Sequence, residues 1–330
     1  MIRRELIAGG NGIDIIKFIM SFAVITIHAP EYLWPNERNY YWLIDWIIRL
    51  AVPFFFIASG FLIQKKMDTL VNQSACREYL RTRASKLFRI WAIWLFIYVP
   101  LALWGMHDME VSMVQLCLTY IEGILLTGHS IHAQPLWFIY SMAIIVWLWS
   151  FFVKSRAWLW ILFMSFVILS LLGVYNQKYW NNEYVQDAIV WVLGGGLPIT
   201  VGALLYSYRV KLQLVNNYIL IITCILLSLI LYIQQLPFYP AIGGGAIFLL
   251  SYYIRPQWKI NYLALRKESM WIYYLHMYII IAAMIVVRQF DLSLNRMCLL
   301  ISIYIITWLI AIGITRLCLR PRFMCGWRFL

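Results

Sequence analysis

Long apolar stretches recur along the whole chain of 330 residues. Read in windows of about 19 residues, the sequence holds ten stretches that are each long enough to cross a hydrocarbon core of about 30 Å as a helix. They are 13–34, 40–64, 87–105, 135–153, 157–175, 187–207, 214–234, 239–254, 269–287 and 297–317. Because backbone polar groups in lipid must be satisfied internally, such stretches fold as helices. The sequence therefore predicts an all-α polytopic membrane protein with about ten transmembrane helices.

Composition narrows the class further. Hydrophobic residues make up 63% of the chain and charged residues 12%, which excludes a water-soluble enzyme. No long linker or low-complexity tract interrupts the sequence, so we expect a single integral-membrane domain over residues 1–330. The six cysteines show no CxxC motif or paired spacing, so we expect no metal site. A half-apolar stretch between the third and fourth apolar segments, residues 111–126, predicts an interfacial helix.

The positive charges predict the orientation of the chain. With an even number of spans and the N-terminus inside, only four of the 27 Lys and Arg residues fall on outer segments: Arg38, Lys178, Arg288 and Arg296. The positive-inside rule then places both termini in the cytoplasm. The net charge of +13 therefore needs no nucleic-acid partner. The same basic inner face suits anionic membrane lipids or an anionic cofactor, and composition does not separate the two.

Three ionisable residues stand in the first apolar stretch: Asp14, Lys17 and His28. Such side chains at membrane depth cost about 2.5–3.5 kcal/mol each on insertion scales and indicate a functional site. Asp14 and Lys17 are three residues apart and share a helical face, so they are placed to form an ion pair. The simpler alternative is that Lys17 snorkels to the inner interface and Asp14 is a charge at the start of the helix.

His28 lies near the outer end of this stretch, with Glu31 one turn further on. This spacing lets a carboxylate orient the imidazole as a general base, although a lone histidine at a span end is more often only hydrogen bonded there. The distance from Lys17 favours function. Eleven residues of helix rise about 16–17 Å and bring the two side chains to within about 20° of each other around the axis. One helix would thus line a pore with a cation near the inner face and a base near the outer face.

The second stretch contains Asp45 and Arg49 at the spacing of a helical ion pair, followed by Pro53. Proline disfavours helix at the preceding residue, so we expect a kink there. Asp45 explains the burial of Arg49 only in part, so we interpret Arg49 as functional. For Ser59 and Gly60, close helix packing through small residues is the simpler interpretation.

The segment before the third stretch is the most basic of the chain. Arg83, Lys86 and Arg89 follow one another at intervals of three residues and lead directly into the apolar part. Positive-inside anchoring explains two of these cations, and the complete series suits a cradle for several phosphates.

Taken together, these motifs resemble the bacterial acyltransferase-3 family of integral-membrane O-acyltransferases. The resemblance rests on the order of four motifs: Asp14-x-x-Lys17 with His28, Pro53-Phe54-Phe55-Phe56-x-x-Ser59-Gly60-Phe61, Arg83-x-x-Lys86-x-x-Arg89, and Leu136-Trp137-Phe138. Beyond the first 140 residues or so it rests on the ten stretches and on Tyr273-Tyr274-Leu275-His276. The chain departs from the family pattern at Lys17, where Arg is usual, and at Pro135, where a histidine often precedes the Leu-Trp-Phe motif.

The resemblance implies a location in the bacterial cytoplasmic (inner) membrane. It also implies transfer of an acyl group, usually acetyl, from cytoplasmic acyl-CoA to a hydroxyl of a glycan or lipid-linked sugar at the outer face. For this chemistry we hypothesise that His28 is the general base, that Glu31 orients it, and that Arg49 or a nearby donor stabilises the oxyanion, with no metal involved. The residues expected to bind acetyl-CoA are Asp14, Lys17, Ser59, Arg83, Lys86, Arg89 and Trp137. The main alternative is a transporter or flippase, for which many spans and the glycine runs 194–196 and 243–245 would serve equally well. A non-catalytic membrane scaffold leaves Lys17, His28 and Arg49 unexplained.

Overall fold

The computed structural model describes residues 10–33, 42–107, 113–153, 157–175, 188–212, 217–254, 256, 258–291 and 295–318. These residues form helices and no strand. The helices in chain order are α2 (Gly10–Leu33), α3 (Trp42–Arg49), α4 (Ala51–Met67), α5 (Gln73–His107), α6 (Met113–Leu126), α7 (Leu136–Phe152), α8 (Ala157–Tyr175), the π-helix η2 (Ala188–Leu193), α10 (Gly196–Ser207), α11 (Arg209–Leu212), α12 (Asn217–Ile233), α13 (Tyr239–Tyr253), α14 (Tyr262–Gln289) and α15 (Arg296–Cys318). The all-helical fold expected from the apolar stretches is confirmed for this part of the chain.

Six helical segments in the described ranges are long and apolar enough to cross a membrane. They are Asn11–Leu33, Trp42–Met67, Gln73–Gly105, Ile189–Ser207, Tyr262–Gln289 and Arg296–Cys318. Shorter apolar helices fall on the expected fourth, fifth and seventh stretches and on the expected interfacial helix. These segments support a membrane protein. The number of ten spans and the cytoplasmic location of the termini stay predictions, and residues 1–9 and 319–330 lie outside the described residues.

The kink expected in the second stretch appears as a break between α3 and α4. The helix stops at Arg49, and a turn closes where the amide of Leu50 donates to the carbonyl of Ile47 at 3.1 Å. Pro53 then stands in the first turn of α4. Its missing N–H costs nothing at that position, because the first amides of a helix have no partner within it. The break at Leu50 therefore lies three residues before Pro53.

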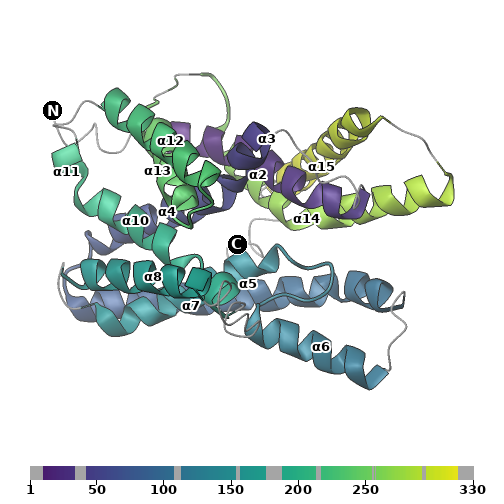
Figure 1. The fold of residues 1–330 in the computed structure, drawn as a ribbon, viewed down its shortest axis with the longest axis horizontal. Coiled ribbons are helices and arrows are strands. Elements are labelled where there is room, and N and C mark those ends of the chain that lie inside the picture. Colours follow the sequence, from purple (N-terminus) through teal and green to yellow (C-terminus); the bar gives the residue numbers. More distant parts are fainter. Residues whose placement is uncertain are drawn as a thin grey trace. The chain divides into compact units, whose positions relative to one another are not determined.

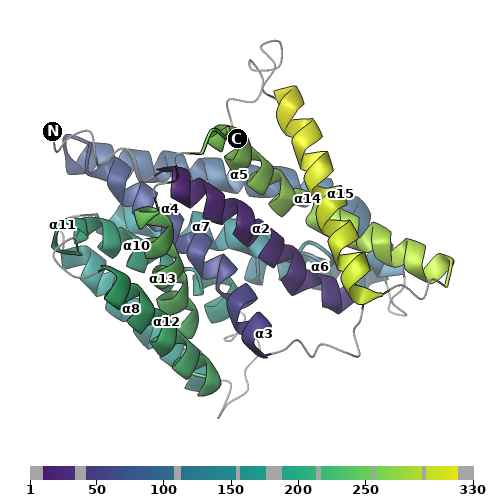
Figure 2. The same cartoon turned by 90° about the horizontal axis from the view of Figure 1, so that it is seen from above.

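The chain divides into two compact units. The first unit consists of residues 1–51 and 247–330, so it joins the two ends of the chain. In it α2 packs along α14, and α15 packs against both helices (Figures 1 and 2). Close approach of α2 to α13 depends on Gly12, since a Cβ there would overlap the backbone carbonyl oxygen of Ser251. The first described helix thus packs against elements from the C-terminal part of the chain.

The second unit consists of residues 52–246 and contains the long helix α5, which packs along α7 (Figure 1). The indole N–H of Trp91 on α5 donates to the carbonyl of Gly128 at 2.6 Å, which ties the helix to the turn before α7. The backbones of α4 and α10 approach each other closely at two glycines. A Cβ on Gly60 would overlap the carbonyl of Ile199, and a Cβ on Gly202 would overlap the carbonyl of Ile57. The small-residue packing expected at Gly60 is therefore what the structure shows.

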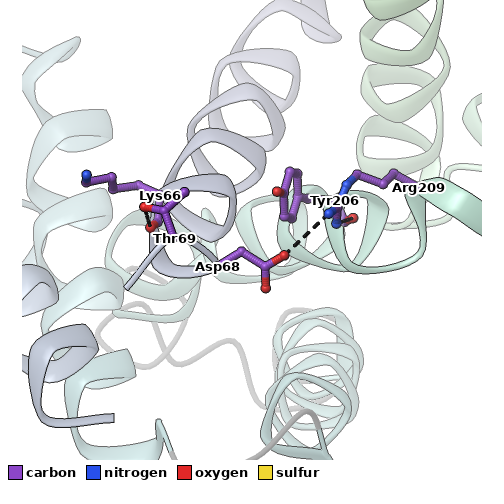
Figure 3. A network of polar contacts seen from close by, with 5 residues as sticks. All are labelled: Lys66, Asp68, Thr69, Tyr206 and Arg209. Atoms are coloured by element: carbon purple, nitrogen blue, oxygen red, sulfur yellow. Dashed lines mark hydrogen bonds and ion pairs between the residues drawn. The ribbon is translucent and has the colours of Figure 1, made fainter. Parts of the chain in front are cut away.

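A polar network joins the end of α4 to the start of α11 in the same unit (Figure 3). Arg209 lies 3.4 Å from the carboxylate of Asp68 and donates to the carbonyl of Tyr206 at 2.8 Å. Its guanidinium also lies over the ring of Tyr206, 3.8 Å from the centroid. Both Asp68 and Arg209 are partly exposed, so this network links the two helix ends at the surface of the unit.

Candidate active site

The first unit holds two polar pairs between α2 and α14. Asp14 pairs with Arg266, and the ring of His28 lies beside the ring of His276. In both helices the histidine follows the charged residue in the chain, so α2 and α14 run in the same direction. At 1.5 Å per residue the two pairs are separated by about 21 Å along α2 and about 15 Å along α14. The charged pair and the histidine pair therefore lie at different depths of one helix packing.

The carboxylate of Asp14 is held at both of its oxygens. Arg266 Nε donates to Oδ1 at 2.9 Å, and Arg266 Nη2 donates to Oδ2 at 2.7 Å. The side chain of Asp14 is 5% exposed and that of Arg266 58% exposed. Because Nε and one Nη are bound to the carboxylate, the guanidinium plane is fixed in orientation. Arg266 is a partner of Asp14 that the spacing of Asp14 and Lys17 did not predict.

His28 and His276 are close neighbours, with ring centroids 5.5 Å apart and ring planes inclined by 32°. His28 is half-buried, and His276 is fully buried. Nδ1 of His276 lies 2.7 Å from the carbonyl oxygen of Tyr273. Two residues before His28, and so on the opposite side of α2, the hydroxyl of Thr26 is hydrogen bonded to Tyr304 of α15. The histidine pair thus connects α2 to α14, and the Thr26–Tyr304 hydrogen bond connects α2 to α15.

Lys17 and Glu31 flank this region on α2. Lys17 is half-buried, whereas the side chain of Glu31 is exposed. Lys17 lies between Asp14 and His28 along the helix, as its place in the sequence requires. An exposed Glu31 is less suited than a buried group to hold the imidazole of His28 in one orientation.

Arg49 forms the ion pair with Asp45 that the spacing indicates, at 2.6 Å from Nε to Oδ2. The side chain of Arg49 is 56% exposed and that of Asp45 is 22% exposed, so the burial expected for Arg49 is wrong. The pair closes α3 just before the break at Leu50. A charge-paired arginine at a helix break can donate further hydrogen bonds, because the guanidinium carries five N–H groups.

The basic series of Arg83, Lys86 and Arg89 lies in the second unit, on α5. All three side chains are exposed. Ala84 and Leu87, which stand between them, are buried at 1% and 5% exposure, so the helix separates a packed face from a basic face. Arg81, on an adjacent turn, lies over the ring of Phe151, 5.8 Å from its centroid. The three cations therefore form one open positive strip, as the spacing predicts.

Trp137 and Ser59 also belong to the second unit. Trp137 contacts Phe56 and Trp191, with centroid distances of 5.8 Å and 5.4 Å. The hydroxyl of Ser59 donates to the carbonyl of Phe55 one turn earlier at 2.8 Å. Trp137 is thus one member of an aromatic cluster, and the hydroxyl of Ser59 is bonded within its own helix.

Sequence reasoning did not single out Arg266 or His276 as site residues. His276 was visible as part of the Tyr-Tyr-Leu-His motif and as a histidine inside an apolar stretch, which itself marks a candidate site. Arg266 stands before the apolar part of its stretch and is followed by Lys267, so it reads as one of many anchoring cations. Only the packing of α2 on α14 identifies it as the partner of Asp14.

Comparison with known proteins gives a match over nearly the whole chain. The model of an acyltransferase domain, acyltransferase 3, matches residues 11–316 and so covers most of both units. A serine/alanine racemase of Enterococcus gallinarum is 31% identical over 121 residues, which are 35% of this chain and 17% of the racemase. An amino-acid racemase of Enterococcus faecalis is 25% identical over 175 residues, which are 52% of this chain and 22% of that protein. The chain thus covers about a fifth of the length of these two relatives. No solved structure matches.

Proposed function

The chain belongs to the acyltransferase-3 family, and we propose that it transfers an acyl group, acetyl by preference, from cytoplasmic acyl-CoA to a hydroxyl of a glycan or lipid-linked sugar outside the membrane. The geometry that carries the proposal is the half-buried His28 on a helix whose other end holds a buried, arginine-bound carboxylate. A histidine within an apolar helix is costly to insert, and a base is what acyl transfer to an alcohol needs.

In the proposed reaction His28 takes the proton of the acceptor hydroxyl. The hydroxyl oxygen attacks the thioester carbonyl, the carbon–sulfur bond breaks, and an ester and the thiolate of CoA form. His28 then gives its proton to the thiolate, so the products are the acylated sugar and free CoA. Arg49 is proposed to stabilise the oxyanion, and Glu31 to assist His28 from its exposed position.

The remaining expected residues are proposed to bind acyl-CoA. Arg83, Lys86 and Arg89 offer phosphate groups an open strip of three cations on one helix face. Lys17 supplies a further cation from α2, and Asp14 acts through Arg266, whose orientation it fixes. Trp137 and Ser59 are proposed to contribute an apolar wall for the acyl-bearing arm.

Transport is the second candidate function. The π-helix η2, which is followed by a glycine run before α10, supports it, because broken helices line the substrate sites of many transporters. The two racemases do not support a racemase function for this chain, because the matches cover only 17% and 22% of those proteins.

A single assay separates an enzyme from a transporter. Purified protein in detergent or liposomes is incubated with acetyl-CoA labelled in the acetyl group, and with cell-envelope glycan as acceptor. We expect release of free CoA together with label in the glycan, and a His28→Gln variant of normal stability should lose at least about a hundredfold in rate. Full activity in that variant would remove His28 from the mechanism, and absence of any CoA release by the wild type would favour transport.

A further inference from the structure

His276 is a second buried histidine that the proposed mechanism does not use. It stands on α14, and no part of its side chain is exposed. Nδ1 lies 2.7 Å from the carbonyl oxygen of Tyr273 and 3.3 Å from that of Ile272. A carbonyl only accepts hydrogen bonds, so Nδ1 must carry the proton. A neutral imidazole has one N–H, which leaves Nε2 as a bare acceptor.

This Nε2 is buried and has no hydrogen-bond partner among the described residues. A buried acceptor without a donor costs about 1–3 kcal/mol. Such groups are rare in folded proteins and each calls for an explanation. A phenylalanine or leucine would fill an apolar site on α14 without this cost. The unsatisfied nitrogen is therefore an acceptor that a neighbouring donor can bind.

The neighbouring side chain that can supply this donor is His28. The two ring centroids are 5.5 Å apart. When two imidazoles share an N–H···N hydrogen bond of about 3 Å, their centroids lie about 5–5.5 Å apart. The rings are thus at a centroid separation that is compatible with a hydrogen bond between one nitrogen of each ring.

We propose that His276 is the positioning residue of His28. The unprotonated Nε2 of His276 accepts a hydrogen bond from the one ring N–H of His28. The other ring nitrogen of His28 is then unprotonated, and its lone pair faces the acceptor hydroxyl. This inference rests on the proposed role of His28 as base. When His28 takes up the hydroxyl proton, its cationic ring still donates to His276, and no proton passes to His276. A buried neutral imidazole thereby does the orienting work that an exposed Glu31 does poorly.

Three substitutions of His276 separate this role from simple packing. The amide of His276→Gln reaches about as far as Nε2 and can offer an oxygen acceptor there. The amide of His276→Asn reaches only about as far as Nδ1, and His276→Phe fills the space without any acceptor. We expect kcat to fall about 10–100-fold in the Asn and Phe variants with the KM for acetyl-CoA unchanged, as for other orienting groups. The Gln variant should recover most of the lost kcat. Ser269→Ala, which removes another buried polar group of α14, should leave kcat unchanged.

Equal kcat in the Gln, Asn and Phe variants would overturn the proposal, and so would a loss confined to KM. For variants that fail to fold, nitrogen NMR of the wild type labelled in its histidines replaces the kinetics. It should show His276 protonated at Nδ1 alone, and a ring N–H of His28 shared with Nε2 of His276. His276 protonated at Nε2 would also overturn the proposal. If His28→Gln is inactive but all three His276 variants keep wild-type kcat, only this inference fails. If His28→Gln is active, the proposed function fails.

Discussion

At the level of single residues, the environment of Asp14 depends on Arg266. Asp14 is nearly fully buried, and both of its oxygens accept hydrogen bonds from the one guanidinium. Removal of one partner from a buried pair costs about 3–5 kcal/mol, because the other charge is left unpaired. Arg266 is more than half exposed, which lowers this cost since water screens its charge.

We therefore predict that Arg266→Ala lowers the free energy of unfolding by about 2–3 kcal/mol. Thermal unfolding of the purified protein in detergent measures the change. Replacing Asp14 by Asn in the Arg266→Ala background should recover part of the loss, because the unpaired buried charge is then gone. Arg266→Lys keeps the charge but not the two parallel hydrogen bonds, so its stability should lie between those of the wild type and Arg266→Ala. Unchanged stability of Arg266→Ala would contradict the pairing.

At the level of helices, α4 and α10 depend on two glycines for their close approach. Gly60 and Gly202 each face a backbone carbonyl of the opposite helix. Backbone cannot move aside as a flexible side chain can, so Gly60→Ala and Gly202→Ala should each destabilise the protein by about 1–3 kcal/mol. Gly313 is a matched control, because a Cβ there meets nothing within 4 Å. Gly313→Ala should be neutral or stabilising in the same melting experiment. Equal melting temperatures for all three variants would disprove the close crossing.

The basic face of α5 is the proposed binding site for the phosphates of acetyl-CoA. Replacing Arg83, Lys86 or Arg89 by Ala should raise the KM for acetyl-CoA by about fivefold each, which corresponds to about 1 kcal/mol for an exposed charge. The effect should shrink as salt is added, because salt screens exposed charges. Arg81→Ala is the matched control, since Arg81 is a cation of the same helix that lies over Phe151. A larger effect from Arg81→Ala than from the series would move the CoA site elsewhere.

The positions of most helices could be predicted from the sequence, whereas the residue pairs between distant helices could not. Apolar length alone located most elements, and the i, i+4 spacing was enough to find the Asp45–Arg49 pair. Arg266 is separated from Asp14 by most of the chain, so no local periodicity could join them. Which ring nitrogen of His276 keeps its lone pair depends on which nitrogen donates to a backbone carbonyl. That choice depends on the side-chain orientation of His276 in the packed structure. Sequence patterns predict local geometry, whereas pairs between distant residues are found only from the packing of the helices.

At the scale of the whole molecule, the direction of α2 relative to α14 constrains the topology. The two helices are parallel, because each runs from its member of the Asp14–Arg266 pair to its member of the His28–His276 pair. Both helices must then enter the membrane from the same side. The chain between them must cross the membrane an odd number of times. Seven crossings, by the expected second to eighth stretches, satisfy this requirement and agree with ten spans in total.

This topology can be tested by the labelling of single cysteines in a cysteine-free background. Asn261 precedes α14 and Phe290 follows it, and both are exposed. With the predicted orientation, Asn261→Cys and Val71→Cys should react with a membrane-impermeant maleimide only after the cells are permeabilised. Phe290→Cys and Gln235→Cys should react in spheroplasts, in which the outer layers of the cell have been removed and the cytoplasmic membrane is intact. Labelling of Asn261→Cys and Phe290→Cys from the same side would show that α14 does not cross. Because α2 and α14 are parallel, α2 would then not cross either. His28 could no longer reach an acceptor at the outer face of the membrane.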